Sequence, residues 1–557
     1  MKLSNSKQSQ EIQMMDLPSF LDFLSFIEKK HSRAQAKQIL LERCAYDLEL
    51  FAQIYFPHYC RYRFNEFHSQ FFQDHKYPQR NLRRVYIAPR GSAKSTTATL
   101  ISPIHDLVFK REKFILIISH TQDQAIQKLK DIRSELVEND RLHNDFGNFF
   151  QSKMVNASEF TANCGNFSCK FKAVGTGTEI RGIRHKEARP TKIIFDDIEH
   201  SERVENEILR KKDAEYFFEV VSKVGSETTN IEGVGTILHE DSLLQKLSKN
   251  PIYETKLYKS IISWSDREDL WEQWRSIMMD LENPDRKTQA QAFYEQNKQE
   301  MLLNTKVLWP EKEDYLYLQN EILEIGKPAF LQEKQNEPIN PEDRVFHQLH
   351  YYKKVPEGFY LELNQETVPF TELKNYCFGA LDPATGQTKP AQGAGSDFSC
   401  IVVGYLHPKT GRIFVDAEWT KVAPPSVFIQ QVFNMNETFH FSKFAVEINL
   451  FRNLLMQDLV RERKEREKKA QGKLIQMPFY EIENNSPKRQ RIFALEPKVS
   501  HGWIVFNRNL SQEFINQISQ FPNAAHDDAP DALEMLYNLC HNKYPASPVS
   551  LDALGRR

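Results

Sequence analysis

The chain has 557 residues, of which 40% are hydrophobic, and its formal net charge is −2 at pH 7. This length is typical of two or three domains. The near-neutral charge excludes a uniformly basic nucleic-acid-binding surface, so any such contact has to come from local patches. No apolar stretch approaches the ~18 residues of a membrane span, the residues through Gln13 are polar and lack the apolar region typical of a signal peptide, and the seven cysteines show no zinc-type pairing. We therefore expect a soluble, intracellular protein that is not secreted.

The part of the chain before residue 82 is predicted to be helical. Residues 1–40 are expected to form an amphipathic appendage, either a docking element or a cap, and a further helix is expected over residues 36–55. An aromatic-rich segment at residues 64–72 contains Gln70. An aromatic ring and a glutamine upstream of a phosphate-binding loop can hold an adenine by stacking and paired hydrogen bonds. Gln70 is therefore a candidate ATP contact, and an ordinary aromatic core helix is the alternative.

Residues 88–96 read Ala-Pro-Arg-Gly-Ser-Ala-Lys-Ser-Thr, between a β-favouring run and a predicted helix. This order is typical of a phosphate-binding loop, in which backbone N–H groups and a helix N-terminus surround a polyphosphate. Lys94 would reach the β- and γ-phosphates, and the Ser95 hydroxyl would bind Mg²⁺. Ala88 and Ala93 replace the glycines of the standard motif, so a plain turn with an exposed lysine is the alternative. The candidate ATP contacts of the loop are Arg90, Gly91, Ser92, Ala93, Lys94, Ser95 and Thr96.

The alternation of strands and helices from residue 82 onward favours a parallel sheet. One predicted strand ends in two carboxylates, as a Mg²⁺–nucleotide site requires, because one carboxylate positions the water shell of the metal and the next polarises the attacking water. We assign Asp196 to the metal and Asp197 to the water, with Glu199 in reserve, and a helix N-cap is the alternative. Strands are predicted at residues 82–87, 113–119, 168–174, 192–195 and 230–236, and helices at 94–109, 122–139 and 202–220.

Two further segments fit a nucleotide site. A glycine-rich, basic loop over residues 175–185 precedes the acidic strand. Its Arg181 or Arg184 is a candidate finger on the γ-phosphate, in cis or toward a neighbouring chain, and a basic surface loop is the alternative. The strand at 230–236 ends on Thr236, a candidate contact that couples the phosphate state to movement.

The second half of the chain is predicted to form a separate domain. The polar, proline-containing residues 334–341 have the composition of a linker, and we place the boundary between residues 340 and 370. Strands are predicted at residues 376–382, 398–406, 412–419, 443–447, 474–479 and 503–506, and helices at 425–439, from 450, near 487–495 and from 526.

Four carboxylates stand where these elements end or begin. Asp382 ends the first strand, Glu447 ends the strand after the first helix, and Asp528 and Asp531 share one face of the final helix. If the first and fourth strands are neighbours, the four converge, and such a cluster would repel itself without divalent metal. Two Mg²⁺ or Mn²⁺ ions held there suit an in-line attack on a phosphodiester. The alternative for any single aspartate is a cap or turn residue.

Together these motifs resemble those of the large subunit of a tailed-bacteriophage DNA-packaging terminase, over nearly the whole chain from about residue 40. The resemblance implies an α/β chain with a helical appendage (1–40), a P-loop ATPase domain with a mainly parallel sheet (41–345), a linker region (346–370) and an RNase H-like nuclease domain with a mixed sheet (371–557). It rests on the loop at 88–95, the Ile-Arg-Gly-Ile-Arg-His core of 177–190, the acidic strand at 193–199, residues 330–338, Leu381-Asp382-Pro383 and residues 527–533.

The resemblance also implies a function. ATP hydrolysis would drive viral DNA into a procapsid, and the nuclease would cut concatemeric DNA. The implied cofactors are ATP and Mg²⁺ or Mn²⁺, with two ions in the nuclease site. The implied partners are double-stranded DNA, a portal protein, the small terminase subunit and further copies of this chain in a homo-oligomeric ring, a pentamer. The implied location is the host cytoplasm, transiently on the procapsid.

Carried over residue by residue, the resemblance shows one departure, since many relatives carry Glu where this chain has Asp197. For the nuclease triad it favours Asp528 over Asp531 as the third ligand beside Asp382 and Glu447. Two other functions fit the same sequence: a helicase or repair-type DNA-dependent ATPase with an inactive RNase H-like domain, and a non-enzymatic, nucleotide-gated scaffold. The phosphate, Mg²⁺ and coupling roles fall on Lys94, Ser95, Asp196 and Thr236.

Overall fold

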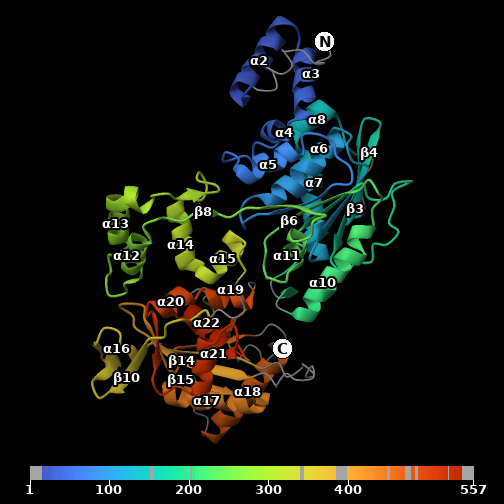
Figure 1. Cartoon of the computed structure of the whole chain (residues 1–557). Helices are drawn as coiled ribbons and strands as arrows, with labels where there is room; N and C mark the ends of the chain where they lie inside the picture. Colours follow the sequence, from blue (N-terminus) through green and yellow to red (C-terminus); the bar gives the residue numbers. More distant parts are fainter. Residues whose placement is uncertain are drawn as a thin grey trace. The chain divides into compact units, whose positions relative to one another are not determined.

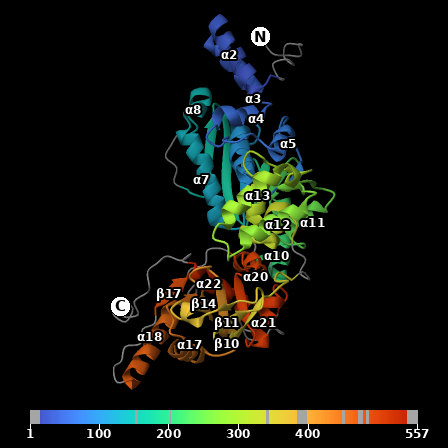
Figure 2. The ribbon, with the colours of Figure 1, turned by 90° about the vertical axis from the view of Figure 1, so that its left-hand side faces the viewer.

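The computed structural model describes residues 15–150, 156–200, 203–204, 206–338, 344–383, 398–447, 452–470, 478–482, 487–524 and 526–541. Its contacts divide the chain into two compact units (Figures 1 and 2). Among the described helices, none combines the length and the hydropathy that a bilayer crossing requires. The first unit comprises Met1–Trp264, Thr305–Leu318 and Leu331–Pro338, and the second comprises Ser265–Asn304, Gln319–Phe330 and Ile339–Arg557.

The first unit is built on a seven-stranded sheet with the order β3-β4-β2-β5-β6-β1-β7. Every neighbouring pair is parallel except β3 and β4, which confirms the predicted mainly parallel sheet. The sequence pattern did not predict β3 or β7, which lie at the two edges. The strands are β1 (Arg83–Ile87), β2 (Phe114–Ser119), β3 (Glu159–Cys164), β4 (Phe167–Gly175), β5 (Lys192–Asp196), β6 (Asn230–Gly235) and β7 (Glu254–Leu257).

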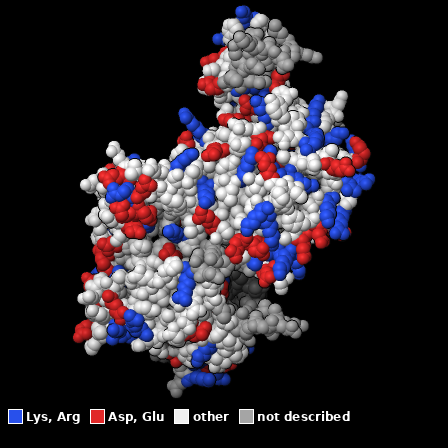
Figure 3. All heavy atoms as spheres, viewed as in Figure 1, with Lys and Arg blue, Asp and Glu red and all other residues white. Residues whose placement is uncertain are grey.

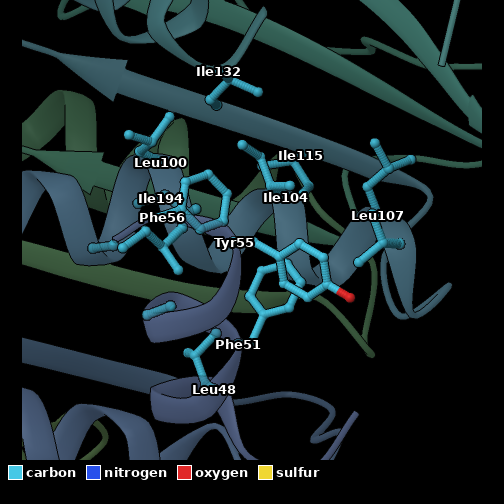
Figure 4. Close-up of a cluster of buried hydrophobic side chains, with 14 of the residues drawn as sticks. Leu48, Phe51, Tyr55, Phe56, Leu100, Ile104, Leu107, Ile115, Ile132 and Ile194 are labelled. Atoms are coloured by element: carbon cyan, nitrogen blue, oxygen red, sulfur yellow. The ribbon is translucent and has the colours of Figure 1, made fainter. Parts of the chain in front are cut away.

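Helices cover both faces of this sheet, because alternate residues of a buried strand point to opposite sides. Ile115 and Ile117 of β2 pack with α4 (Leu48–Tyr55), α5 (Glu66–Asp74), α6 (Ser102–Val108) and α7 (Gln122–Glu138). Figure 4 shows part of this core, with side chains of α4 and α6 gathered beside Ile115. On the opposite face, Leu116 and Ile118 pack with α10 (Glu207–Glu219) and α11 (Leu243–Ser248).

Shorter elements complete the first unit. The predicted N-terminal appendage forms two helices, α2 (Leu17–Lys30) and α3 (Arg33–Cys44), whose side chains Phe20 and Cys44 join the α4–α7 core. Residues after the phosphate-loop candidate form a π-helical segment, η1 (Thr96–Ile101), before α6. The others are α8 (Asp140–Phe146), η2 (Val221–Lys223) and the pair β8 (Ile261–Ser263) and β9 (Lys306–Val307).

The second unit contains a nine-stranded mixed sheet with the order β12-β11-β10-β18-β15-β14-β13-β16-β17. The segment β15-β14-β13 is antiparallel, and β16 and β17 then run parallel to β13, an arrangement that agrees with the expected RNase H-like, mixed sheet. The strands are β10 (Tyr351–Val355), β11 (Gly358–Leu361), β12 (Thr367–Val368), β13 (Cys377–Asp382), β14 (Ser399–Leu406), β15 (Ile413–Lys421), β16 (Lys443–Glu447), β17 (Phe479–Ile482) and β18 (Ile504–Asn507).

Strands β10–β12 occupy residues that the sequence pattern assigns to a linker region. β10 pairs with β18 in parallel, so this segment extends the sheet of the second unit. The pairing partner lies about 150 residues downstream in sequence, and no local pattern encodes it. Helices α12 (Glu268–Met279) and α13 (Arg286–Met301) also belong to the second unit, although the predicted boundary places them in the first. The division between the units passes through α14 (Tyr315–Ile325) and α15 (Lys327–Gln335).

Both faces of the mixed sheet are covered, and α22 and α17 lie on opposite sides of β14 (Figure 2). Phe378 and Ala380 of β13 face α22 (Asp528–Cys540), α19 (Lys488–Phe493) and α21 (Gln512–Ser519). Cys377 and Leu381 face α17 (Pro425–Phe439) and α18 (Arg452–Lys469). The remaining helices are α16 (Phe370–Leu373) and α20 (Glu496–Ser500). The predicted strand at 474–479 and the start of the helix at 450 lie partly outside the described residues.

Candidate functional site

The phosphate-loop candidate follows β1 at the carboxyl edge of the parallel sheet, where the Ala88 N–H donates to the Gly235 carbonyl of β6 at 3.0 Å. Gly91 and Ala93 have φ values of 85° and 59°, so both adopt left-handed backbone. This conformation costs an L-residue about 1–2 kcal/mol. The loop nevertheless adopts it at Ala93, where the standard motif has a glycine. The π-helical segment η1 follows directly, and such segments occur frequently at functional sites.

The lysine and serine of the loop meet the acidic strand and the predicted coupling threonine. Lys94 Nζ donates to Thr236 Oγ1 at 2.8 Å and lies 3.8 Å from Asp197 Oδ1. Ser95 Oγ donates to Asp196 Oδ1 at 3.1 Å. The structure thus brings together five residues that the sequence places on three separate segments. Of the other loop residues, Ser92 is buried and Thr96 is half-buried at the start of η1.

Asp196 is fully buried at the end of β5 and is surrounded by donors. In addition to Ser95, the Thr99 hydroxyl donates to Oδ2 at 3.3 Å and Lys128 Nζ lies 2.6 Å from Oδ2. Burial raises the pKa of Asp196 above its ordinary value, against the opposing charge of Lys128. Sequence reasoning missed Lys128, although its position between Ala125 and Ile132 on the buried side of α7 is a signal, because a lysine there requires a partner.

The next two acidic residues differ in their surroundings. Asp197 has left-handed backbone, with φ of 47°, and its half-exposed carboxylate faces Lys94. Glu199 is buried, and its two oxygens accept the backbone N–H groups of Leu243 at 2.6 Å and Leu244 at 3.1 Å, in the first turn of α11. Burial raises the pKa of Glu199 to about 7. Glu199 therefore caps a helix, while Asp197 is the acidic residue placed beside the phosphate-loop lysine.

A later segment of the chain returns to the phosphate loop. The Arg90 N–H donates to the Glu333 carbonyl at 2.9 Å, and Lys312 Nζ donates to the Gly91 carbonyl. Lys334 Nζ forms a buried ion pair with Glu313 Oε1 at 3.0 Å. A Cβ added to Gly91 would lie 3.2 Å from Glu313 Oε1 and 3.7 Å from Lys334 Nζ, so this ion pair adjoins the loop. Sequence reasoning missed these residues, because the contacts cross more than 200 positions of sequence. The Arg90 side chain itself is exposed.

The proposed adenine contact Gln70 lies on α5, where its side-chain amide donates to Asp74 Oδ1 at 3.0 Å. Other aromatic rings adjoin the loop, since Trp309 lines a small pocket together with Pro89 and Ser92. Trp309 packs edge-on against His68 with centroids 5.0 Å apart, and Lys312 Nζ lies 4.8 Å from the Trp309 ring. Burial, with a contribution from Lys312, lowers the pKa of His68 to about 3. Trp309 and His68 thus adjoin the loop, and no sequence signal connected them.

The two candidate arginine fingers lie on the connection between β4 and β5. Arg181 is exposed. Arg184 lines a hollow together with Lys113 and Thr191, which precede β2 and β5 and therefore mark the amino ends of the strands. The phosphate loop lies at the carboxyl ends, and a five-residue strand spans about 16 Å. This placement puts Arg184 away from its own phosphate loop, and the role of Arg184 as a finger, in cis or toward a neighbouring chain, stays a prediction.

The second candidate site lies in the mixed sheet. β13 ends at Asp382 and β16 at Glu447, and the strands are parallel neighbours with Leu381 opposite Val446. This register confirms that the first and fourth predicted strands are adjacent and brings Asp382 and Glu447 to one end of the sheet. The backbone of Glu447 is described, whereas its side chain lies outside the described part of the structure.

The carboxylates of this site gather around one lysine. Lys488 Nζ lies 2.8 Å from Asp527 Oδ1, 3.3 Å from Asp531 Oδ2 and 3.6 Å from Asp382 Oδ2. Burial alone would lower the pKa of Lys488, but the three carboxylates hold it well above its ordinary value. Arg491 Nη1 contacts Asp531 Oδ1 at 2.9 Å as a second cation. Sequence reasoning noted the basic cluster at Lys488 and Arg491 without connecting it to the carboxylates.

The preference for Asp528 over Asp531 as the third ligand stays a prediction. Asp528 is half-buried at the start of α22, whereas Asp531 is buried and shares Lys488 with Asp382. Within the described residues, no group of three His, Cys, Asp or Glu side chains is arranged to hold a metal ion, and this search does not include the Glu447 side chain. Carboxylate oxygens are nevertheless the ligands that Mg²⁺ and Mn²⁺ prefer. The ammonium of Lys488 occupies the position of a cation among them.

No family model and no curated protein matches the chain. Among solved structures, it is similar to the large terminase of a thermophilic bacteriophage in complex with ATP-gamma-S, with 9% identity, coverage of 86% of this chain and 99% of that chain, and a TM-score of 0.45. It is also similar to the HK97 bacteriophage large terminase (10% identity, 89% and 99% coverage, TM-score 0.31). A third structure, the large terminase ATPase domain of Thermus phage P74-26, gives 12% identity, 52% and 98% coverage and a TM-score of 0.30.

Proposed function

We propose that the chain is the large subunit of a tailed-phage terminase, which uses ATP hydrolysis to move viral DNA into a procapsid and cuts concatemeric DNA with a metal-dependent nuclease. The observation that carries this proposal is the presence of two acidic sites on one chain, each at the end of central strands. One joins Ser95 to Asp196 and Lys94 to Thr236. The other gathers Asp382 and Asp531 at one end of a different sheet.

The first site has the groups that ATP hydrolysis requires. Backbone N–H groups of the loop and the helix that follows would surround the phosphates. Lys94 would neutralise the β- and γ-phosphates, and Ser95 with Asp196 would hold Mg²⁺. The half-exposed Asp197 carboxylate beside Lys94 would orient the attacking water. The hydrogen bond from Lys94 to Thr236 connects the phosphate site to the end of β6, which supports the coupling role of Thr236.

The second site has the groups that hydrolysis of a phosphodiester requires. Asp382, Glu447 and Asp531 are the residues that would hold Mg²⁺ or Mn²⁺, with Asp528 one helical turn before Asp531 as an alternative ligand. Two such ions, when bound, supply the nucleophile and stabilise the leaving group. The residues of this chain contribute negative charge and fixed positions at the ends of β13, β16 and α22. Lys488 forms ion pairs with two of these carboxylates, Asp382 and Asp531, and so neutralises part of their charge.

The remaining parts of the proposal follow from the sequence resemblance. Double-stranded DNA is the substrate, and a portal protein and the small terminase subunit are the partners. Several copies of the chain, five in this proposal, form a ring on the portal in the host cytoplasm, where the procapsid is filled. An arginine of one copy, Arg181 or Arg184, would act on the nucleotide of its neighbour, which is compatible with the position of Arg184 away from its own phosphate loop.

Two single substitutions in the full-length protein test the proposal. Lys94→Ala removes the phosphate-loop cation and is expected to abolish ATP hydrolysis while Mn²⁺-dependent cutting of plasmid DNA continues. Asp382→Asn removes a metal ligand and is expected to do the reverse. Matched controls are Lys130→Ala and Glu465→Gln at exposed positions of α7 and α18. Loss of both activities in either site variant would contradict two independent sites.

The alternative function is a helicase or repair-type DNA-dependent ATPase with an inactive RNase H-like domain. One observation favours it, namely that Lys488 already occupies the centre of the carboxylate group as a structural ion pair would. Under this alternative the unaltered protein shows DNA-stimulated ATP hydrolysis and no cutting with either Mg²⁺ or Mn²⁺. Cutting that disappears in Asp382→Asn excludes the alternative.

A further inference from the structure

The hollow that Arg184 lines lies at the amino ends of the parallel strands of the first unit, at the edge of the sheet opposite the phosphate loop. We call it the basic hollow and define it by Lys110, Lys113, Arg184, Arg189, Ser226 and Thr228. These residues come from the connections that lead into β2, β5 and β6. The hollow has a volume of about 560 Å³. Figure 3 shows that blue Lys and Arg atoms and red Asp and Glu atoms are interspersed over the visible face of the protein.

The cations of the basic hollow are available for a ligand. Among the described residues, Lys110, Lys113 and Arg184 make no ion pair, and Arg189 donates one hydrogen bond, to the Gly225 carbonyl at 3.3 Å. Two neighbouring arginines differ, since Arg80 pairs with Glu112 and Arg111 donates to backbone carbonyls. In the described part of the chain, Glu187 is the single carboxylate that lines the hollow. The chain as a whole has a net charge of −2, so this excess of positive charge is local.

The arrangement of these groups fits phosphates in a row. Strands β2, β5 and β6 are adjacent in the sheet, and neighbouring strands are about 4.8 Å apart, so the groups at their amino ends extend over about 10 Å. A nucleic-acid strand places one phosphate per ~3.4 Å of helix axis. Lysine, arginine, serine and threonine side chains are the usual donors to phosphate oxygens. The row therefore matches two or three consecutive phosphates.

The lining disfavours a nucleotide. Phe167 is the only aromatic residue among the described residues that line the hollow, so a base has no pair of rings to stack between. The connection leading into β2 also lacks the glycine-rich sequence that brings backbone N–H groups to a polyphosphate, and within the described residues no glycine of the connection into β5 lines the hollow. Most of the lining side chains are exposed, as expected for contact with a long, extended ligand.

We propose that the basic hollow binds the phosphodiester backbone of nucleic acid, at a site separate from the phosphate loop. The inference deepens the proposed function, on which it rests for the presence of DNA as a substrate. It assigns to Lys110 and Lys113 a role in holding DNA without regard to base sequence, because contacts to phosphates position the duplex and carry no sequence information.

The test is DNA binding by the full chain carrying Lys110→Glu together with Lys113→Glu. Fluorescence anisotropy with a labelled DNA duplex, between about 50 and 200 mM salt, gives the affinity and its salt dependence. We expect binding at least about tenfold weaker than that of the unaltered protein, with a salt slope smaller by about two, because two phosphate contacts are lost. The matched control, Lys130→Glu with Lys212→Glu on exposed parts of α7 and α10, has the same change of charge and is expected to bind within about twofold of the parent.

Three further readouts make the result decisive. Thermal unfolding shows whether the double variant is folded, and Lys113→Met gives a milder change if it is not. ATP hydrolysis without DNA tests the proposed function separately: if the parent protein hydrolyses ATP and the hollow variant binds DNA as tightly as the control, the inference fails while the function stands. Competition with sodium tripolyphosphate is the last readout. If the double variant no longer binds tripolyphosphate but binds the duplex as tightly as the parent protein does, the hollow is a site for a small polyphosphate, and the proposal is overturned.

Discussion

The two acidic sites of the chain differ in the balance between carboxylates and donors. In the first unit a single buried carboxylate, Asp196, receives donors from Ser95, Thr99 and Lys128. In the second unit three carboxylates, on Asp382, Asp527 and Asp531, share the ammonium of Lys488, and Arg491 contacts Asp531 as a second cation. The first site is therefore preorganised by its own chain, whereas the second carries an excess of negative charge that additional cations would compensate.

This difference predicts how each site responds to a substitution and to the cations in solution. A carboxylate with a full set of hydrogen bonds is costly to alter, because each lost partner leaves a buried polar atom unsatisfied. The stability of the carboxylate cluster around Lys488 depends instead on the cations in solution.

Asp196→Asn breaks the donor network of the first site. The amide group would retain the shape of the side chain but lose the charge that orients the metal's water shell, so we expect ATP hydrolysis to require about 10- to 100-fold more Mg²⁺. Phosphate release measured over a Mg²⁺ titration gives this value. Asp131→Asn, on the exposed side of α7, is the matched control. A normal Mg²⁺ requirement in Asp196→Asn would show that Asp196 has only a structural role.

Lys488→Met leaves the carboxylates of the second site without their shared cation. We expect the metal-free protein to lose about 2 kcal/mol of unfolding free energy, because partly buried like charges remain uncompensated. Mn²⁺ is expected to restore this loss, so that it raises the melting temperature of the variant more than that of the parent. Thermal unfolding with and without Mn²⁺ measures both values, with Lys464→Met at an exposed position of α18 as the control. An equal response to Mn²⁺ in variant and parent would refute metal binding by these carboxylates.

Lys334→Met tests whether the segment that returns to the phosphate loop contacts the nucleotide. The ammonium lies beside Gly91, and loss of one charge-assisted contact to a phosphate is expected to raise the KM for ATP about tenfold with little change in kcat. Lys334→Arg is expected to recover part of the loss. Lys259→Met is the control, because Lys259 forms an exposed ion pair with Glu337 of the same segment at 2.6 Å. A fall in kcat at constant KM would rule out this interpretation.

Ala93→Gly has the smallest expected effect. Glycine adopts the left-handed backbone of this position without the steric penalty of a Cβ, although it also gains freedom in the unfolded chain. We expect a net stabilisation of about 0.5 kcal/mol, measured by urea unfolding. The control is Ala98→Gly, which places glycine inside the helical segment η1 and is expected to lower the free energy of unfolding by about 0.5–1 kcal/mol. Destabilisation by both substitutions would show that the Ala93 side chain makes a packing contribution larger than its backbone strain.

Local sequence patterns predicted most of the central strands and the positions where carboxylates end them. The apolar strand β5 followed by Asp196 and the strand β13 ending at Asp382 are signals within a few residues. The strands β13 and β16 are neighbours, as the convergence of the carboxylates required. They are parallel because β15 runs in the same direction as β13 and the helix α17 connects β15 to β16.

The features that escaped prediction depend on contacts between distant segments. β10 pairs with β18, and Lys312 reaches the loop at Gly91, without any pattern in the sequence that marks the partner. Lys488 shows the same limitation, since its neighbours on α19 are basic and its partners are carboxylates on two other elements. A charged residue reveals in sequence that it needs a partner, but the fold decides which one it meets.

The helix after the phosphate loop has a mechanical consequence. Ser95 and Thr99 contact Asp196 at the carboxyl end of β5, and Ser102 and Asp106 contact Lys192 at its amino end. Rotation of this helix about its axis would break all of these contacts, so the helix is fixed in rotation against the strand. From Ser95 to Asp106 it spans about 15 Å.

Because β5 holds this helical segment at both ends, the segment would move along its axis as a rigid body with little bending. Lys110 is the second residue after α6, so one end of this helical segment lies at the loop that would hold the γ-phosphate and the other end at the basic hollow. A change in the distance between the phosphate loop and the phosphates would move both ends of this helical segment by a similar amount. The first unit thus contains a stiff element between the place where ATP would be hydrolysed and the place where we propose that DNA is held.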